Sequence, residues 1–108
     1  MTPDTPTFFA DIATQAAQAP ADSIISRALL TTPAVRTVLF SFAPGQQLSD
    51  HTASRPAILH VFSGSGTLSA LGQTHPAQPG AWLYLPANTP HAVHADSDLV
   101  LLLLLIGE

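Results

Sequence analysis

The chain has 108 residues, enough for one domain with a small hydrophobic core. Charged residues make up only 9% of the chain, its formal net charge is −4, and its three cations are all arginine. A slightly acidic chain without a basic stripe is a poor candidate for binding nucleic acid or an anionic membrane, so we expect neither partner. The absence of cysteine excludes disulfides and thiolate chemistry.

Residues 1–22 are predicted to form an N-terminal tail with a short helix. The first six residues are rich in Pro and Thr, which is typical of a frayed terminus. Apolar side chains recur at helical spacing between Phe8 and Gln18, and Pro20 is expected to end that helix. No basic region is followed by an apolar stretch, so no signal peptide is predicted and a cytoplasmic location is the default expectation.

From residue 23 to residue 108 the hydrophobic period changes to two, which predicts a single β-domain. Pro and Gly separate the expected strands, which are 23–30, 35–43, 57–63, 67–71, 74–78, 81–85, 91–95 and 99–106. A hairpin turn is expected at Gly72-Gln73. The last strand is apolar throughout, which is typical of a strand at the centre of a sheet with both faces buried. Short strands with regular turn signals indicate a sandwich or a barrel.

Two glycine-led segments hold the most chemical information. Each segment begins with a glycine and contains a histidine. The informative residues are Gly45, His51 and Gly64 in the first segment and Gly80, Pro86 and His91 in the second. Together the segments resemble the two sequence motifs of the cupin family. The resemblance covers roughly residues 24–106, and it implies a small single-domain cupin, a double-stranded β-helix or jelly-roll barrel.

The resemblance also implies that His51 and His91 point into the mouth of the barrel. Imidazoles there bind divalent transition metals, so Zn, Ni, Fe, Mn or Cu are candidate cofactors. Ala53 and Ala57 stand where the family has its second His and its Glu. Two imidazoles alone make a poor site, so weak metal binding and no metal binding both stay open. Strand parity places His60 on the outside, and it becomes a further candidate ligand only if a bulge turns it inward.

A small ligand pocket is predicted around the two histidines. Its expected lining residues are Ala53, Arg55, Ala57, Leu59, Val61 and Val93. Such a lining suits a small, largely apolar molecule with a polar handle, and Arg55 offers a partner for a carboxylate or a phosphate. The alternative is an interior that side chains fill, as in many small barrels.

Three functions are compatible with this sequence, and whether the protein is an enzyme stays open. The first is binding of a small molecule in the barrel, with an incomplete or weak metal site and no assignable reaction. The second is a metal-dependent enzyme using His51 and His91, because similar small cupins include dioxygenases, isomerases and decarboxylases. The third is a non-catalytic assembly module. The low charge predicts a homodimer through a sheet face or an exchanged N-terminal strand, with Trp82 or Tyr84 at the seam.

Overall fold

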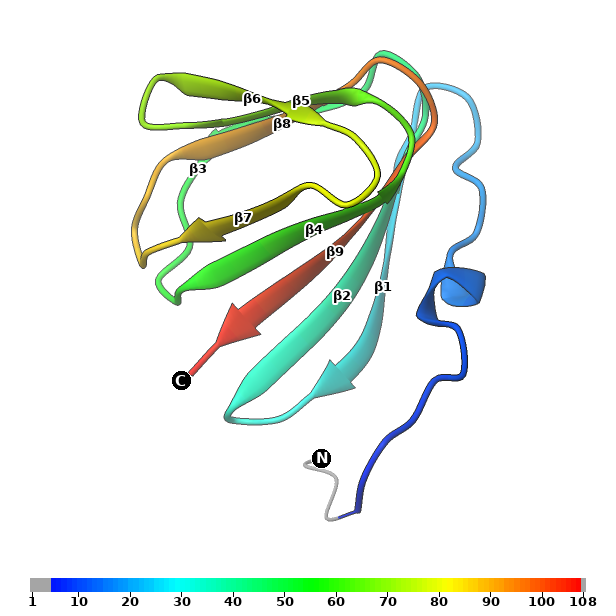
Figure 1. Ribbon diagram of the computed structural model, residues 1–108, viewed down its shortest axis with the longest axis vertical. Helices are drawn as coiled ribbons and strands as arrows, with labels where there is room; N and C mark the ends of the chain where they lie inside the picture. Colours follow the sequence, from blue (N-terminus) through cyan, green and yellow to red (C-terminus); the bar gives the residue numbers. More distant parts are fainter. Residues whose placement is uncertain (1–4, 108) are drawn as a thin grey trace.

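The structure is a computed structural model that describes residues 5–107. Within this range nine β-strands form two antiparallel sheets that face each other (Figure 1). The five-stranded sheet consists, in spatial order, of β1 (Ile24–Thr31), β2 (Val35–Phe42), β9 (Leu99–Ile106), β4 (Ala57–Ser63) and β7 (Trp82–Leu85). The four-stranded sheet consists of β3 (Gln47–His51), β8 (His91–Ala95), β5 (Gly66–Ala70) and β6 (Gln73–Ala77). The predicted all-β jelly roll is confirmed.

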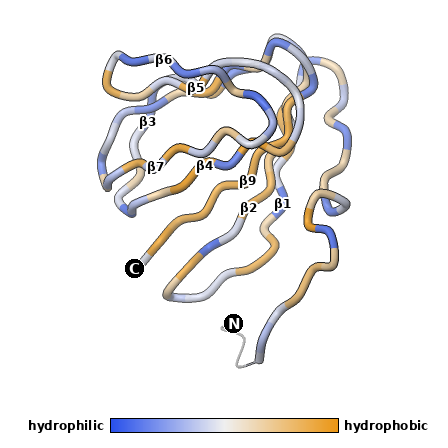
Figure 2. Tube along the Cα trace, viewed as in Figure 1, coloured by the Kyte–Doolittle hydropathy of each residue, from blue (hydrophilic) through white to orange (hydrophobic). Residues whose placement is uncertain are grey.

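Strand β9 lies at the centre of the five-stranded sheet, between β2 and β4. Figure 2 shows it as a continuous hydrophobic stretch, whereas β6 and the neighbouring turns are largely hydrophilic. Leu101 faces the core at 2% exposure and Leu102 faces the other side of the sheet at 8%. Both faces of this strand are therefore covered in part, as its uninterrupted apolar sequence predicts.

The hydrophobic core fills the space between the two sheets. Its largest buried side chains include Phe42, Val61, Leu99 and Leu101 from the five-stranded sheet and Leu68 from the four-stranded sheet. Full burial of such a side chain stabilises the fold by about 1.5–3 kcal/mol. The core thus holds the two sheets together by apolar contacts, and within residues 5–107 the one ion pair, His94–Asp96, lies outside it.

Two strand predictions need correction. Strand β3 was not predicted, because its sequence Gln-Leu-Ser-Asp-His holds only one apolar residue and the strand is defined by its pairing with β8 at a sheet edge. The hairpin between β5 and β6 turns at Leu71-Gly72, one residue earlier than expected. Both turn residues have positive φ, 50° and 77°, as a two-residue turn of the I′ type requires.

The N-terminal segment is mostly extended. Its helical part is a single 3₁₀ turn, Ile12–Gln15, where the Asp11 carboxylate accepts a hydrogen bond from the Ala13 backbone N–H. The predicted helix between Phe8 and Gln18 is therefore wrong in length. Short helices are costly to nucleate, and none of the residues in this turn is buried against the sheet. Among residues 5–107 no helix is long and apolar enough to cross a membrane, and the cellular location stays a prediction.

Candidate functional site

Two histidines meet at one end of the barrel. His51 ends β3 and His91 begins β8, and the two residues are paired across these neighbouring strands. Their ring centroids lie 4.2 Å apart, with an angle of 53° between the ring planes. Two imidazoles that are forty residues apart in the sequence thus form one contact, and this contact is the centre of the candidate site.

A bulge in β3 gives His51 its direction. The register between β3 and β8 shifts between Leu48 and His51, so two residues separate them instead of one. Ser49 and Asp50 lie on the outer surface of the sheet, whereas Leu48 and His51 both line the interior. In a regular strand, residues 48 and 51 would face opposite ways. The bulge therefore aims the imidazole into the barrel, as bulges often do beside functional sites.

The same local contact orients both imidazole rings. Nδ1 of His51 lies 2.8 Å from the Ser49 carbonyl oxygen, and Nδ1 of His91 lies 2.9 Å from the Thr89 carbonyl oxygen. A carbonyl oxygen only accepts, so each Nδ1 carries the hydrogen and donates it. In the neutral ring this leaves Nε2 as a free acceptor or metal ligand. The site thus presents two Nε2 lone pairs, one on a buried ring, His91, and one on an exposed ring, His51.

A cavity of about 40 Å³ lies beneath the two rings. Its lining residues are Phe40, Leu48, His51, Leu59, His91, Val93, Leu101 and Leu103. A cavity of this size holds one or two water molecules, while sites for organic ligands measure about 300–1,000 Å³. The interior of the barrel is therefore largely filled by side chains, and a larger ligand has room only above the rings.

The predicted pocket residues do not all gather at this cavity. Leu59 and Val93 line it together with the two histidines. Val61 and Ala57 are packed in the core at 0% and 1% exposure. Ala53 lies in the loop between β3 and β4, where its carbonyl accepts a hydrogen bond from the Asn88 N–H at 2.7 Å. This bond ties together the two loops that precede β4 and β8.

Asn88 stands where the second family motif has Gly. Its φ is 63°, a left-handed conformation that Gly adopts freely and that Asn tolerates better than most other residues. The first motif keeps its glycine at Gly64, where φ is 95° and a Cβ would collide with the Asp98 carbonyl oxygen. The backbone therefore explains which motif glycine tolerates replacement.

Arg55 is turned toward the protein. Its Nη2 donates a hydrogen bond to the Leu105 carbonyl oxygen at 3.3 Å. Its Nε is buried and has no hydrogen-bond partner among the described residues, and no carboxylate of residues 5–107 lies within ion-pair distance of it. This hydrogen bond holds the guanidinium against the end of β9.

The other histidines with described neighbours do not reach the pair. His60 lies on the outer face of the five-stranded sheet, opposite Trp82 across the strands and 5.1 Å between ring centroids from Phe62. His94 lies on the outer surface of the four-stranded sheet, 3.2 Å from Asp96. Between residues 5 and 107 there is no cluster of three or more His, Cys, Asp or Glu side chains that could hold a metal.

The donor set fits only a fraction of a metal coordination shell. Ala53 and Ala57 supply no side-chain ligand, which leaves two imidazoles. With a metal–nitrogen distance of about 2.1 Å, two imidazoles at a tetrahedral angle have centroids roughly 5 Å apart. The observed 4.2 Å is shorter, so these rings contact each other instead of spreading around a shared ion. The residues present do not fit a complete resident metal site.

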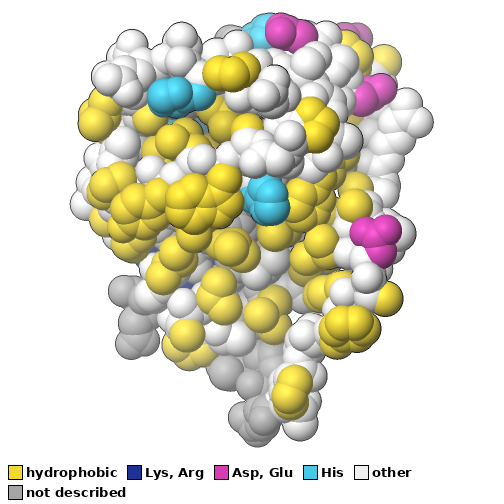
Figure 3. All heavy atoms as spheres, in the orientation of Figure 1, with side chains coloured by type: hydrophobic (Ala, Val, Ile, Leu, Met, Phe, Trp, Pro, Cys, Tyr) yellow, Lys and Arg dark blue, Asp and Glu magenta, His cyan; other side chains and the backbone are white. Residues whose placement is uncertain are grey.

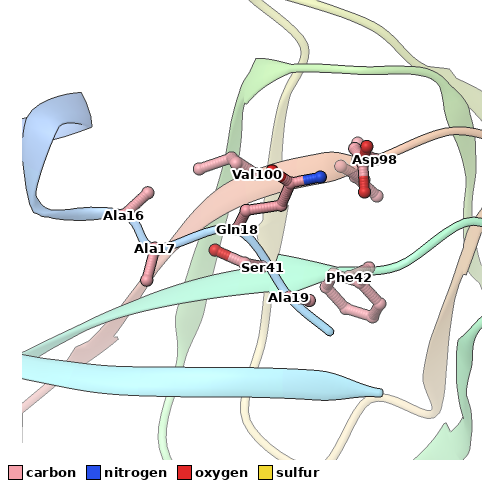
Figure 4. Close-up of a pocket in the computed structure, with 9 residues that line it drawn as sticks. Ala16, Ala17, Gln18, Ala19, Ser41, Phe42, Asp98 and Val100 are labelled. Carbon is pink, nitrogen blue, oxygen red and sulfur yellow. The ribbon is translucent and has the colours of Figure 1, made fainter. Parts of the chain in front are cut away.

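A larger hollow, of about 330 Å³, lies at the other end of the barrel (Figure 4). It is formed where residues 16–19 of the N-terminal segment pass over Ser41, Phe42 and Val100. Its polar side chains are those of Gln18, Ser41 and Asp98, and no imidazole reaches it. This hollow is larger than the cavity beneath the histidines, but the two imidazoles that contact each other lie at that cavity.

Sequence reasoning missed half of the residues that line the cavity. These are Phe40, Leu48, Leu101 and Leu103. Parity could have found Leu101 and Leu103, since alternate residues of a central strand face the core. Leu48 could not be found in this way, because its position relative to His51 depends on the bulge.

The sequence from residue 38 to residue 107 matches the family model described as a cupin domain. The chain belongs to the cupin family. No curated protein matches the sequence at a significant level. The glycine-led motifs, the nine-stranded jelly roll and the family match therefore agree on the family, and they leave the activity open.

Solved structures agree with this assignment. A cupin superfamily protein from Desulfitobacterium hafniense aligns with a TM-score of 0.85 at 20% identity, over 100% of this chain and 99% of its own. A cupin 2 conserved barrel domain protein from Leptotrichia buccalis gives 0.79 at 30% identity, over 86% of this chain and 45% of its own. The DMSP lyase DddQ from Ruegeria pomeroyi aligns with a TM-score of 0.75 at 18% identity, over 81% of this chain and 48% of its own. The first and third are similar in fold alone.

Proposed function

We propose that this cupin binds a small molecule at the mouth of its barrel, with the His51–His91 pair as the polar anchor. The observation that carries the proposal is the convergence of the two rings at 4.2 Å, each fixed by a backbone carbonyl through Nδ1. Ring orientations held in this way are preorganised, so a ligand gains two hydrogen bonds without having to order the rings. No reaction is assigned.

The chemistry of the site selects the class of ligand. Two Nε2 acceptors call for a ligand with hydrogen-bond donors, such as hydroxyl or N–H groups. Leu48 and Leu103 in the lining supply an apolar wall, and Arg55 is not among the lining residues. A small neutral molecule with a hydroxyl group and an apolar body therefore suits the site better than an anion. The small volume of the cavity supports binding above the rings and not deep inside the barrel.

A metal-dependent enzyme is the second candidate, and the Nδ1 contacts favour it. Histidines that ligate a metal usually donate their other ring N–H to a carboxylate or a backbone carbonyl. A divalent transition metal held by two imidazoles would need water or substrate for its remaining positions, and its affinity would be low. The DMSP lyase from Ruegeria pomeroyi shows that a similar fold can carry an enzyme. The short distance between the rings and the two alanines count against a resident metal here.

Nuclear magnetic resonance of the histidine side chains separates the two candidates. Long-range 1H–15N spectra distinguish the five imidazoles of the chain. We expect phenol and catechol to shift Nε2 of His51 and His91, while His75 and His94 stay unchanged as internal controls. Zinc chloride is expected to shift the same two rings with a dissociation constant above the micromolar range. His51→Ala, at an exposed ring, should abolish the response of His91 to both probes or weaken it at least tenfold.

Two results would overturn the proposal. If neither phenols, simple alcohols nor amides move the signals of His51 and His91, the pair is not a ligand anchor. If the purified protein instead holds one metal per chain at nanomolar strength, the metal-dependent alternative takes its place.

A further inference from the structure

The hollow at the end of the barrel away from the histidine pair has an apolar lining and a polar margin. Residues 16–19 of the N-terminal segment form one wall, and the adjacent ends of β2 and β9 form the other (Figure 4). Its apolar lining residues are Ala16, Ala17, Ala19, Phe42, Leu99 and Val100. The volume of about 330 Å³ lies at the lower end of the range of organic ligand sites, about 300–1,000 Å³. The hollow therefore has room for a small organic molecule.

Ser41 is the buried polar residue of this hollow. The residue is only 4% exposed, and Figure 4 shows it next to residues 17–19 of the N-terminal segment. Within residues 5–107 its hydroxyl group forms no hydrogen bond. The side-chain atoms of this range that are both sealed from solvent and unpaired do not include Ser41 Oγ, so this oxygen opens into the space beside the segment. An unpaired hydroxyl group in a buried residue favours a ligand that supplies its hydrogen bond.

The charge of the lining favours a cation. Asp98 is the one ionic side chain among the described residues that line the hollow, and it lies exposed at the margin together with Gln18. Arg27 lines only the smaller neighbouring cavity on the side of β1. In the view of Figure 3, acidic side chains lie along the side of the molecule that the N-terminal segment occupies, and no arginine is visible there. With a formal net charge of −4 for the chain, the surrounding field attracts cations and repels anions.

The wall formed by the N-terminal segment is held at both of its ends. Nη1 of Arg27 donates a hydrogen bond to the Gln15 carbonyl oxygen at 3.4 Å. At the other end, Oγ of Ser23 donates a hydrogen bond to the Pro20 carbonyl oxygen at 2.6 Å, and Ala19 is buried at 7% exposure. A ligand therefore meets a wall that is already in place, which lowers the entropic cost of binding.

We propose that this hollow is a second binding site, which takes a small organic ammonium ion with an apolar body. Asp98 is the partner of its charge, and the oxygens of Ser41 and Gln18 are further acceptors for its N–H groups. The apolar lining contacts the body of the ligand. The proposal is independent of the ligand at the histidine pair. Since charge pairs at exposed positions contribute little, we expect affinity in the millimolar range.

Nuclear magnetic resonance of the backbone amides tests the proposal on the full chain. The probe is benzylammonium chloride at constant ionic strength, and we expect it to shift the signals of Gln18, Ser41 and Val100 until they saturate. Benzyl alcohol has the same body without the charge, and it should bind more weakly by roughly two- to fivefold. Sodium benzoate carries the opposite charge and should produce no saturable shift of these signals.

Two substitutions and a matched control assign the shifts to this site. Asp98→Asn should weaken benzylammonium binding by roughly two- to fivefold, because it removes an exposed charge pair. Ser41→Ala should weaken it by roughly three- to tenfold, because it removes a hydrogen bond. The control is Asp96→Asn, which removes an exposed carboxylate that pairs with His94 and does not line the hollow, and it should leave the affinity unchanged. Far-ultraviolet circular dichroism of each variant verifies the β-fold, and Asp98→Asn decides alone if Ser41→Ala does not fold.

Three results would overturn the proposal. The first is the absence of saturable shifts of Gln18, Ser41 and Val100 with benzylammonium. The second is equal binding of benzylammonium by the wild type and by Asp98→Asn, or equal binding of benzylammonium and benzoate by the wild type. The third is a response confined to the imidazole signals of His51 and His91, which would assign the ammonium ion to the histidine pair instead.

Discussion

The two sheets of this cupin differ in the polarity of their outer faces. The four-stranded sheet is apolar toward the core and polar toward solvent, where Gln47, Ser49, Thr67, Ser69 and His94 line a shallow depression. The outer face of the five-stranded sheet instead carries apolar side chains such as Leu102, Leu104 and Ile58 in its middle strands, beside Thr37 and His60. A sheet with one face in water shows a regular alternation of apolar and polar residues, and only the four-stranded sheet does so. The outer face of the five-stranded sheet is therefore the better candidate for the contact of the predicted homodimer.

The sheets also differ in chemistry. Both imidazoles of the candidate site, His51 and His91, come from the four-stranded sheet. The position where the family has its Glu, Ala57, is on β4 of the five-stranded sheet and is packed in the core. The five-stranded sheet therefore supplies packing on both of its faces and no ligand to the site, whereas the four-stranded sheet supplies the reactive groups.

The largest effect is expected from truncation of β9 on its inner face. Leu101→Ala should lower the free energy of unfolding by about 2–5 kcal/mol, because Leu101 is buried in the core and a cavity would remain. Leu104→Ala, on the outer face of the same strand, should cost clearly less in the monomer. Urea denaturation at low protein concentration measures both. Equal losses of stability would mean that the inner and outer faces of the sheet are equally packed in the monomer, which would contradict the difference between the two faces.

The next effect concerns the missing ligands. Ala53→His together with Ala57→Glu should raise the affinity for zinc by at least tenfold, since each added ligand joins two preoriented imidazoles. Without metal the double variant should be less stable than the wild type, because Ala57 is 1% exposed and a carboxylate there is desolvated. Isothermal titration and thermal unfolding with and without zinc provide the two measurements. Ala53→Gln with Ala57→Gln is the control of similar size and weaker ligation.

The smallest effect is expected on the outer face of the four-stranded sheet. Thr67→Glu should change the free energy of unfolding by less than about 0.5 kcal/mol, because a polar residue replaces another on a solvated face. Thr67→Glu should also leave the molecular mass of the protein in solution unchanged. A glutamate at Trp82 or Tyr84 on β7, at the predicted dimer contact, should reduce that mass. A shift in mass would show that both sheets take part in assembly, and the contrast between their outer faces would lose its meaning.

The amino-acid sequence by itself determined the family, the β-architecture and the place of β9. The motif glycines and histidines are local sequence patterns, although the contact that requires Gly64, with the Asp98 carbonyl, is tertiary. The apolar run from Leu99 to Ile106 has only one stable place, the centre of a sheet, because an exposed edge of that composition would associate. Such features depend on neighbours in the chain and can be read from it.

The tertiary structure alone decided how these pieces meet. Strand β3 exists because β8 pairs with it, and its bulge turns His51 inward next to His91. The N-terminal segment is mostly extended beside the outer face of the five-stranded sheet, a surface built from strands that are distant in sequence. The cavity of about 40 Å³ depends on side chains from both sheets. All of these depend on contacts between residues distant in sequence, and hydrophobic periodicity within one segment carries no information about such contacts.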